Sequence, residues 1–471
     1  MKSSKKLLWY NLAFMAFASV WSFGNVVNGF AKYDGLKAII SWILMFALYF
    51  VPYALMVGEL GSAFKKFGGG VSSWIKETIG PKIAYYAGWT YWVVHMPYIS
   101  QKPQSALIAL SWAVTGSAEY VNDMNPLVLQ IGCLVVFLLF AWITTKGINP
   151  LKNIATIAGS SMFIMSLLFI LLMVAAPAIV PGNTHAIDWS LDSFLPAFDW
   201  KFLTSLSILV FAVGGAERIS PYVNKMKDPS KGFPKGMIFL AIMVASTAIL
   251  GTLSLGMMFD PQNIPNDLMM NGAYYAFQQL GAYYGVGNLF LIVYALCNVV
   301  AQLSVLIVSI DAPLRMLLDS ADTDYIPKWL LKQNDKTVYT NGIKVVVIIV
   351  SILIIVPGLL PGDVNGMFEA LIQLNSVTMP LRYLWVFVAY IALKKAKQKF
   401  DSDYQFTKSK TLGLIAGGWC FFFTAFACLI GMFSGDIAHI AMNILTPFVL
   451  LGLGLIMPAI ARRDKAKQIE V

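Results

Sequence analysis

The feature that most constrains this chain is a series of long apolar segments that recurs from one end to the other. A helix needs roughly 20 predominantly apolar residues to cross a bilayer, and twelve segments reach that length. Only 12% of the residues are charged, whereas soluble domains contain about 25%. We therefore expect an all-α integral membrane protein with about twelve transmembrane helices, near residues 9–32, 37–58, 84–115, 126–145, 154–180, 202–223, 236–258, 285–310, 342–360, 364–393, 411–432 and 438–461.

The basic residues are distributed unevenly, and their distribution predicts the orientation of the chain. If the N-terminus is placed inside, 28 of the 34 lysines and arginines fall on the cytoplasmic side. The opposite side carries acidic residues such as Glu119, Asp123, Asp188, Asp192, Asp260 and Asp267. This asymmetry is the positive-inside pattern of membrane proteins. We predict that both termini are cytoplasmic and that the net charge of +10 reflects membrane topology, so that no nucleic-acid partner is expected.

Two of the apolar segments contain runs that are poorly suited to a continuous helix. These runs are residues 22–29 in the first expected span and residues 211–217 in the sixth. Glycine in a helix interior costs about 1 kcal/mol relative to alanine, and backbone groups that are freed in a bilayer need a partner. Matched interruptions in two halves of a membrane protein indicate the binding site of a transporter. The alternative is that the glycines only allow close helix packing.

An amino acid offers the two charged groups that such interruptions can bind. Amide groups at the start of a half-helix attract a carboxylate, and carbonyl groups at its end attract an ammonium. The groups expected to meet the carboxylate belong to Ser22, Gly24 and Asn25. Those expected to meet the ammonium belong to Ala212, Gly214 and Gly215.

Two further runs of residues resemble a known superfamily. The first comprises residues 59–74, from Glu59-Leu60-Gly61 to Trp74, and is followed by Ile79-Gly80-Pro81. The second begins at Gly215-Ala216-Glu217 and continues through Asn224, Asp228-Pro229 and Phe233-Pro234 to Gly236. In this order they resemble the amino acid–polyamine–organocation superfamily. Within it, the chain is similar to the bacterial amino acid antiporters of the glutamate/γ-aminobutyrate type.

The resemblance implies a LeuT-type fold, in which two five-helix repeats are related by inversion and spans 1 and 6 are broken. The repeats would occupy residues 9–180 and 202–393, and two peripheral helices would follow within residues 411–461. Because five is odd, the two repeats would have opposite orientations in the membrane. The whole chain, residues 1–471, would form a single transport domain in a bacterial plasma membrane.

The resemblance also implies roles for individual residues of the substrate site. Ser22-Phe23-Gly24 stands where many family members have Gly-Ser-Gly, in the loop that binds the amino acid backbone. Tyr91 falls at the position of a tyrosine that faces the transport pathway. Phe211 matches an aromatic residue that caps the substrate, and Glu217 matches a glutamate associated with proton sensing.

Lys102 is unusual because it lies near the middle of the third expected span. Charges inside a membrane are costly, so they are functional by default. Lys102 could be a countercharge for an acidic substrate group or a titrating amine in proton coupling. It could instead form a structural ion pair, for which Glu369 is the candidate partner. Asn298 and Gln302 could hydrogen-bond a polar substrate tail or serve helix packing.

These features predict a secondary active transporter that moves amino acids or derived amines across the plasma membrane by alternating access. The favoured mode is antiport, proton-coupled symport is the alternative mode, and a non-transporting membrane sensor is the alternative class. An enzyme is not expected, because the sequence shows no nucleophile–base or metal constellation. We expect no cofactor and no metal. The expected partners are the substrate and the lipid bilayer, and a homodimer is one assembly open to the chain.

Overall fold

Among the described residues, eleven helical segments of this computed structural model are long and apolar enough to cross a membrane. They match the expected spans except for the third, near residues 84–115. That stretch forms two successive helices, α6 (Pro81–Val93) and α7 (His95–Thr115), and polar residues such as Gln101 and Lys102 make it less apolar than the others. The all-helical membrane architecture is confirmed, with eleven candidate spans in place of twelve.

The structure describes residues 7–68, 70–117, 119–260, 263, 265–359, 363–396, 400, 402–435 and 437–469. Gly69, within the run of residues 59–74, and the expected span boundary at residue 360 lie outside the described residues. The remaining elements up to residue 179 are α1 (Trp9–Val20), α2 (Phe23–Lys32), α3 (Lys37–Met45), the π-helix η1 (Phe46–Phe50), α4 (Val51–Ala63), α5 (Val71–Thr78), α8 (Glu119–Asn122), α9 (Pro126–Thr144) and α10 (Ile148–Ile179). Those that follow are α11 (Leu191–Phe194), α12 (Trp200–Val213), the 3-10 helix η2 (Ala216–Lys225), α13 (Pro229–Gly256), α14 (Leu268–Tyr283), α15 (Leu289–Leu318), η3 (Lys328–Leu331), α16 (Thr340–Gly358), α17 (Val364–Thr378), η4 (Met379–Arg382), α18 (Tyr383–Lys395), α19 (Lys410–Gly431), α20 (Ile437–Gly452), η5 (Leu453–Leu455) and α21 (Ile456–Ile469).

The first membrane span is interrupted near its middle. The backbone is extended at Trp21 and Ser22, between the end of α1 and the start of α2. This first interruption confirms the predicted break, but it is shorter than the expected run because Gly24 and Gly29 lie within α2. Gly29 has a packing role, since an added Cβ would come within 2.6 Å of the Trp42 ring.

The sixth span is interrupted at Gly214 and Gly215. Gly214 is extended after the last residue of α12, and Gly215 adopts a φ of 110° before η2 begins. Glycine reaches such a positive φ without the steric cost that other residues meet. This second interruption therefore depends on a glycine at position 215 and confirms the predicted break.

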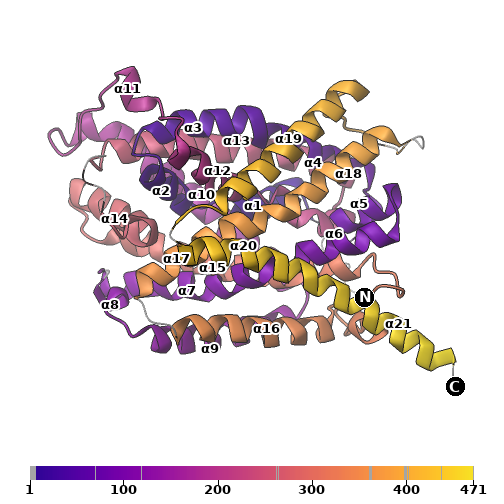
Figure 1. The fold of residues 1–471 in the computed structure, drawn as a ribbon. Helices are drawn as coiled ribbons and strands as arrows, with labels where there is room; N and C mark the ends of the chain where they lie inside the picture. Colours follow the sequence, from indigo (N-terminus) through magenta and orange to yellow (C-terminus); the bar gives the residue numbers. More distant parts are fainter. Residues whose placement is uncertain are drawn as a thin grey trace.

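The helices that carry the interruptions occupy the interior of the bundle. Helix α1 packs against α10 and α13, and the long helices α7 and α15 pack against each other. Figure 1 shows α9 and α16 side by side along one edge, and α18 beside α19. Helices α8, α11 and α14 lie at one end of the bundle, and both chain ends are marked at the other (Figure 1).

The outward faces of the peripheral helices are apolar. Leu171 of α10, Phe422 of α19 and Phe448 of α20 expose 66–70% of their surface. Large contiguous apolar surfaces of this kind are unfavourable in water and mark contact with other apolar material. Since the described residues contain eleven candidate spans, that material is the hydrocarbon interior of the bilayer.

Candidate functional site

A cavity lies between the first and second interruptions. Its volume is about 130 Å³, which is room for several water molecules. Its walls come from both interrupted spans and from α7, α14, α15 and α17. The expected site residues that line it are Ser22, Gly24, Asn25, Lys102, Phe211, Gly214, Asn298 and Gln302.

One wall of the cavity is the start of α2. Ser22 precedes the first helical residue, and the first amide groups of a helix have no acceptor within the helix. These amides and the positive end of the helix dipole favour a negatively charged group. Asn25 joins this wall to the second interruption, because its Nδ2 donates a hydrogen bond to the carbonyl oxygen of Ala212 at 3.3 Å. A carboxylate at the start of α2 would thus lie beside both interruptions.

A second wall carries a chain of side-chain hydrogen bonds on α15. Gln302 Nε2 donates to Asn298 Oδ1 at 3.0 Å, and Asn298 Nδ2 donates to the Tyr274 hydroxyl oxygen at 2.8 Å. The buried Oε1 of Gln302 has no hydrogen-bond partner within the described ranges. This oxygen is an acceptor that a donor group of a bound substrate can reach.

Two cations line the described part of the cavity wall, and both lie near the same aromatic ring. Lys102 Nζ lies 4.2 Å from the centre of the Tyr98 ring, and Arg218 Cζ lies 5.0 Å from it. In the described part of the chain, Lys102 forms no ion pair with Glu369 or with another carboxylate. None of the described residues that line the cavity is an aspartate or a glutamate. The cavity is therefore positively charged.

A buried ion pair lies beside the cavity. Arg382 Nε is 3.3 Å from Glu217 Oε1, and both side chains are completely inaccessible to solvent. The hydroxyls of Tyr53 and Tyr91 donate hydrogen bonds to the two carboxylate oxygens of Glu217. Tyr91, expected to face the pathway, therefore contacts Glu217 and does not line the cavity. The carboxylate connects η2 with α4, α6 and η4.

Arg382 is a site residue that the sequence analysis missed. Its guanidinium contacts the His95 ring and donates from Nη2 to the Tyr383 hydroxyl at 3.2 Å, in addition to its contact with Glu217. The available signal was an arginine inside an expected span, since an intramembrane charge needs a partner. Arg218 and Tyr98, which line the cavity, were also missed, and Arg218 carries the same signal.

Besides Tyr91 and Glu217, three further expected site residues lie outside the cavity. Phe23 packs against the rings of Phe169 and Phe277. Gly215 donates its backbone N–H to a tyrosine hydroxyl beside the buried ion pair. Glu369, on α17, is half-buried and forms no ion pair with a described residue.

Comparison with known proteins identifies the family. A family model described as "Amino acid permease" matches residues 7–456, which is nearly the whole chain. The chain belongs to the amino acid permease family. This permease is therefore a member of the amino acid–polyamine–organocation superfamily, as its motifs predicted. The predictions of a secondary active amino acid transporter and of a protein that is not an enzyme are confirmed.

This permease is similar to several bacterial transporters. It is 50% identical over 475 residues to the aspartate/glutamate permease AcaP of Lactococcus lactis subsp. cremoris, across 98% of this chain and 97% of that one. It is 25% identical over 438 residues to the inner membrane transporter YjeM of Salmonella typhimurium, across 88% and 87% of the two chains. The glutamate/gamma-aminobutyrate antiporter of Lactococcus lactis subsp. lactis is 25% identical over 396 residues, across 81% and 75%. The antiporter type to which the motifs pointed is thus a more distant relative than AcaP.

Proposed function

We propose that this permease transports acidic amino acids, with aspartate and glutamate as substrates. The observation that carries the proposal is the positive cavity, which is lined by Lys102 and Arg218 and by no described carboxylate. Opposite charges attract strongly where water is largely excluded, and a cationic substrate would be repelled by both residues. The name of the 50% identical AcaP, an aspartate/glutamate permease, supports the same substrate class.

The substrate backbone would be bound by the two interruptions. Its α-carboxylate would contact the amide groups at the start of α2, near Ser22 and Gly24, and its ammonium would contact the carbonyl groups that follow α12, near Gly214. The acidic side chain would extend toward the two cations. Phe211 would cover the bound molecule as an aromatic cap. Lys102 acts as a countercharge in this arrangement, because no described carboxylate neutralises it.

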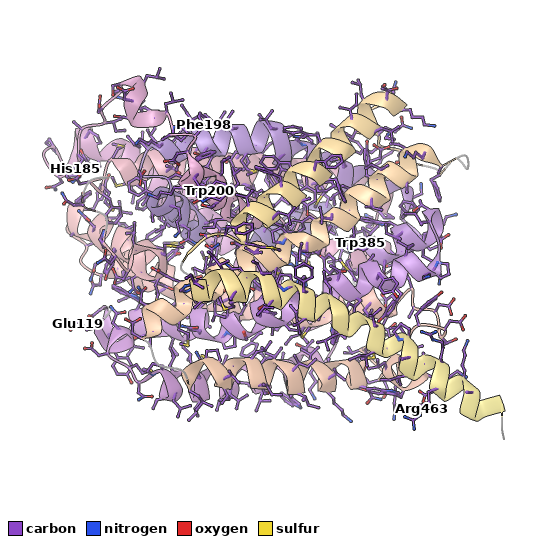
Figure 2. The ribbon with its side chains drawn as sticks, in the orientation of Figure 1. Glu119, His185, Phe198, Trp200, Trp385 and Arg463 are labelled. Atoms are coloured by element: carbon purple, nitrogen blue, oxygen red, sulfur yellow. The ribbon has the colours of Figure 1, made fainter. Side chains whose placement is uncertain are left out.

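Alternating access would use the LeuT-type arrangement of two inverted repeats, residues 9–180 and 202–393, with peripheral helices within residues 411–461, all in one transport domain. The matched interruptions of the first and sixth spans support this arrangement. Both termini would be cytoplasmic, which the asymmetry of basic residues supports. Figure 2 shows Arg463 at one end of the bundle and Glu119 and His185 at the other. A homodimer stays a prediction, which light scattering of the detergent-solubilised protein would test.

Glu217 would couple the cavity to the rest of the bundle. Its carboxylate accepts hydrogen bonds from Tyr53 and Tyr91 and pairs with Arg382, and Glu217 lies two residues after Gly215 of the second interruption. Protonation of Glu217 would weaken the attraction to Arg382 and loosen the contact between η2 and its neighbours. We therefore propose Glu217 as the proton-sensitive group of the transport cycle.

Competition for uptake by the purified permease in proteoliposomes tests the substrate class. We expect saturable uptake of labelled aspartate that unlabelled glutamate inhibits and that arginine and putrescine do not inhibit. Inhibition by arginine or putrescine at concentrations similar to glutamate would refute the proposed class.

The same vesicles test the mode of transport. Uptake that requires a preloaded amino acid or amine would establish the antiport favoured by the sequence. Uptake into empty vesicles that depends on an inward proton gradient would establish symport. Specific binding without flux, in protein shown to be inserted, would indicate a sensor.

A further inference from the structure

Two arginines meet at the second interruption, but only one has a carboxylate partner among the described residues. A Cβ added to Gly215 would lie 3.2 Å from Arg382 Nη2 and 3.5 Å from Arg218 Nη2, so the two guanidinium groups approach the same backbone position. Arg382 pairs with Glu217, whereas Arg218 forms no ion pair with a described residue. A guanidinium cannot lose its charge in a protein. This buried group therefore has a surplus positive charge, which belongs to Arg218.

The contacts of Arg218 leave part of its hydrogen-bonding capacity unused. Its Nη1 donates to the carbonyl oxygen of Ser19 at 3.0 Å, and its guanidinium lies against the Tyr98 ring. Its Nε has no hydrogen-bond partner among the residues that the structure describes, although the side chain is only 2% exposed. A buried charge without a compensating partner is unfavourable. Because Arg218 also lines the cavity, a bound anion can supply the missing partner.

Lys102 differs from Arg218 in both burial and chemistry. Lys102 is half-buried and also lies near the Tyr98 ring. Its ammonium is a compact, strongly hydrated point charge, whereas a guanidinium offers a planar fork that matches the two oxygens of a carboxylate. An ammonium such as that of Lys102 attracts any anion. A guanidinium such as that of Arg218, which Ser19 holds in a fixed orientation, distinguishes a carboxylate from an amide of the same shape.

We propose that Arg218 is the specificity-determining residue of the site and binds the side-chain carboxylate of the substrate. Lys102 strengthens the attraction of the cavity for anions, but its half-buried charge discriminates less strongly between an acid and its amide. This inference rests on the proposed transport of acidic amino acids. It predicts that the selectivity for aspartate over asparagine depends more on Arg218 than on Lys102.

The test uses the full-length permease in proteoliposomes and measures KM and kcat for labelled aspartate and asparagine. In Arg218→Gln we expect KM for aspartate to rise about 10- to 100-fold, the range that corresponds to one hydrogen bond to a charged group. The preference for aspartate over asparagine should fall by a similar factor. Arg218→Lys keeps the charge without the fork, so the rise in KM for aspartate and the loss of preference should both be smaller than in Arg218→Gln. Lys102→Gln, the matched control, should raise KM for aspartate and lower the preference by less than Arg218→Gln, because the half-buried charge of Lys102 is better screened.

The proposal is overturned if folded Arg218→Gln keeps the wild-type preference for aspartate, or if Lys102→Gln is the variant that loses it. Size-exclusion chromatography in detergent shows whether each variant is folded. If Arg218→Gln does not fold, Arg218→Lys decides the question. A wild-type KM and a wild-type preference for aspartate in Arg218→Lys overturn the proposal, and a raised KM with a reduced preference supports it. Failure of the proposed function is recognised separately, because the wild-type protein would then show no preference for aspartate.

Discussion

Glu217 and Arg382 form a completely buried ion pair between η2 and η4, with 3.3 Å between Glu217 Oε1 and Arg382 Nε. Removing one partner of a buried pair leaves an uncompensated charge, which costs about 3–5 kcal/mol. We therefore expect Glu217→Gln to lower the thermal stability of the purified protein strongly and to abolish aspartate uptake. Thermal unfolding in detergent and uptake in proteoliposomes measure the two effects.

The double variant Glu217→Gln/Arg382→Gln separates the contribution of the ion pair to stability from the contributions of the two individual residues. If the ion pair is the dominant interaction, the double variant loses less free energy of unfolding than the two single variants lose together. The reason is that the double variant leaves no unpaired charge from this pair. Strictly additive losses of stability would contradict the assignment. Tyr53→Phe is a milder comparison, since it removes one hydrogen bond to Glu217 and keeps both charges.

Gly215→Ala should destabilise the second interruption. Gly215 has a φ of 110°, and strained backbone conformations of this kind cost non-glycine residues about 1–3 kcal/mol. The matched control is Gly418→Ala on α19, where an added Cβ meets nothing within 4 Å. Alanine is the better helix former, so this control should retain or slightly raise the unfolding temperature. Equal unfolding temperatures for the two variants would show that the second interruption does not require glycine.

Asn25→Asp should weaken the binding of an acidic substrate. Asn25 lies at the start of α2, lines the cavity and donates from Nδ2 to the carbonyl oxygen of Ala212. A carboxylate at this position would repel the substrate carboxylate and would lose the donor to Ala212. We expect KM for aspartate to rise by about tenfold or more, because like charges at close range oppose each other by one or more kcal/mol. The isosteric change tests charge at constant size. An unchanged KM would show that the substrate carboxylates bind elsewhere.

Glu59→Gln should loosen the segment that connects α18 to α19. The Glu59 carboxylate accepts hydrogen bonds from Lys394 Nζ at 2.6 Å, from the Tyr390 hydroxyl at 3.1 Å and from the Phe406 backbone N–H at 2.9 Å. Because loss of the charge weakens all three contacts, trypsin should cleave faster after Lys408 in this variant. Analysis of the fragments by mass spectrometry measures the rate.

Asp403→Asn is the control for this segment. Asp403 is exposed, and its carboxylate lies 4.0 Å from Lys65 Nζ. Exposed ion pairs contribute little to stability, so cleavage should remain close to the wild-type rate. Cleavage that is equally fast in the Asp403 and Glu59 variants would show that Glu59 does not hold the segment.

Most of the fold and part of the site could be predicted from the sequence. Helices that cross a bilayer require long apolar runs, and a helix break requires residues that tolerate it, so both leave a local record in the chain. The interruptions at Trp21–Ser22 and Gly214–Gly215 were therefore expected close to where they occur. The third span was the exception, since its polar residues make α7 less apolar than the other spans.

Pairings between distant residues were decided by the tertiary structure. The sequence placed Lys102, Glu217 and Glu369 in spans, but it could not show that Lys102 pairs with no carboxylate of the described residues or that Glu217 pairs with Arg382. Such contacts depend on which faces of helices far apart in the chain pack together, and no local pattern records this choice. The chain by itself thus determined a helical membrane transporter with two broken spans, because apolarity and glycine act locally. Only the packing of the helices decided which cations face the cavity and which are neutralised beside it.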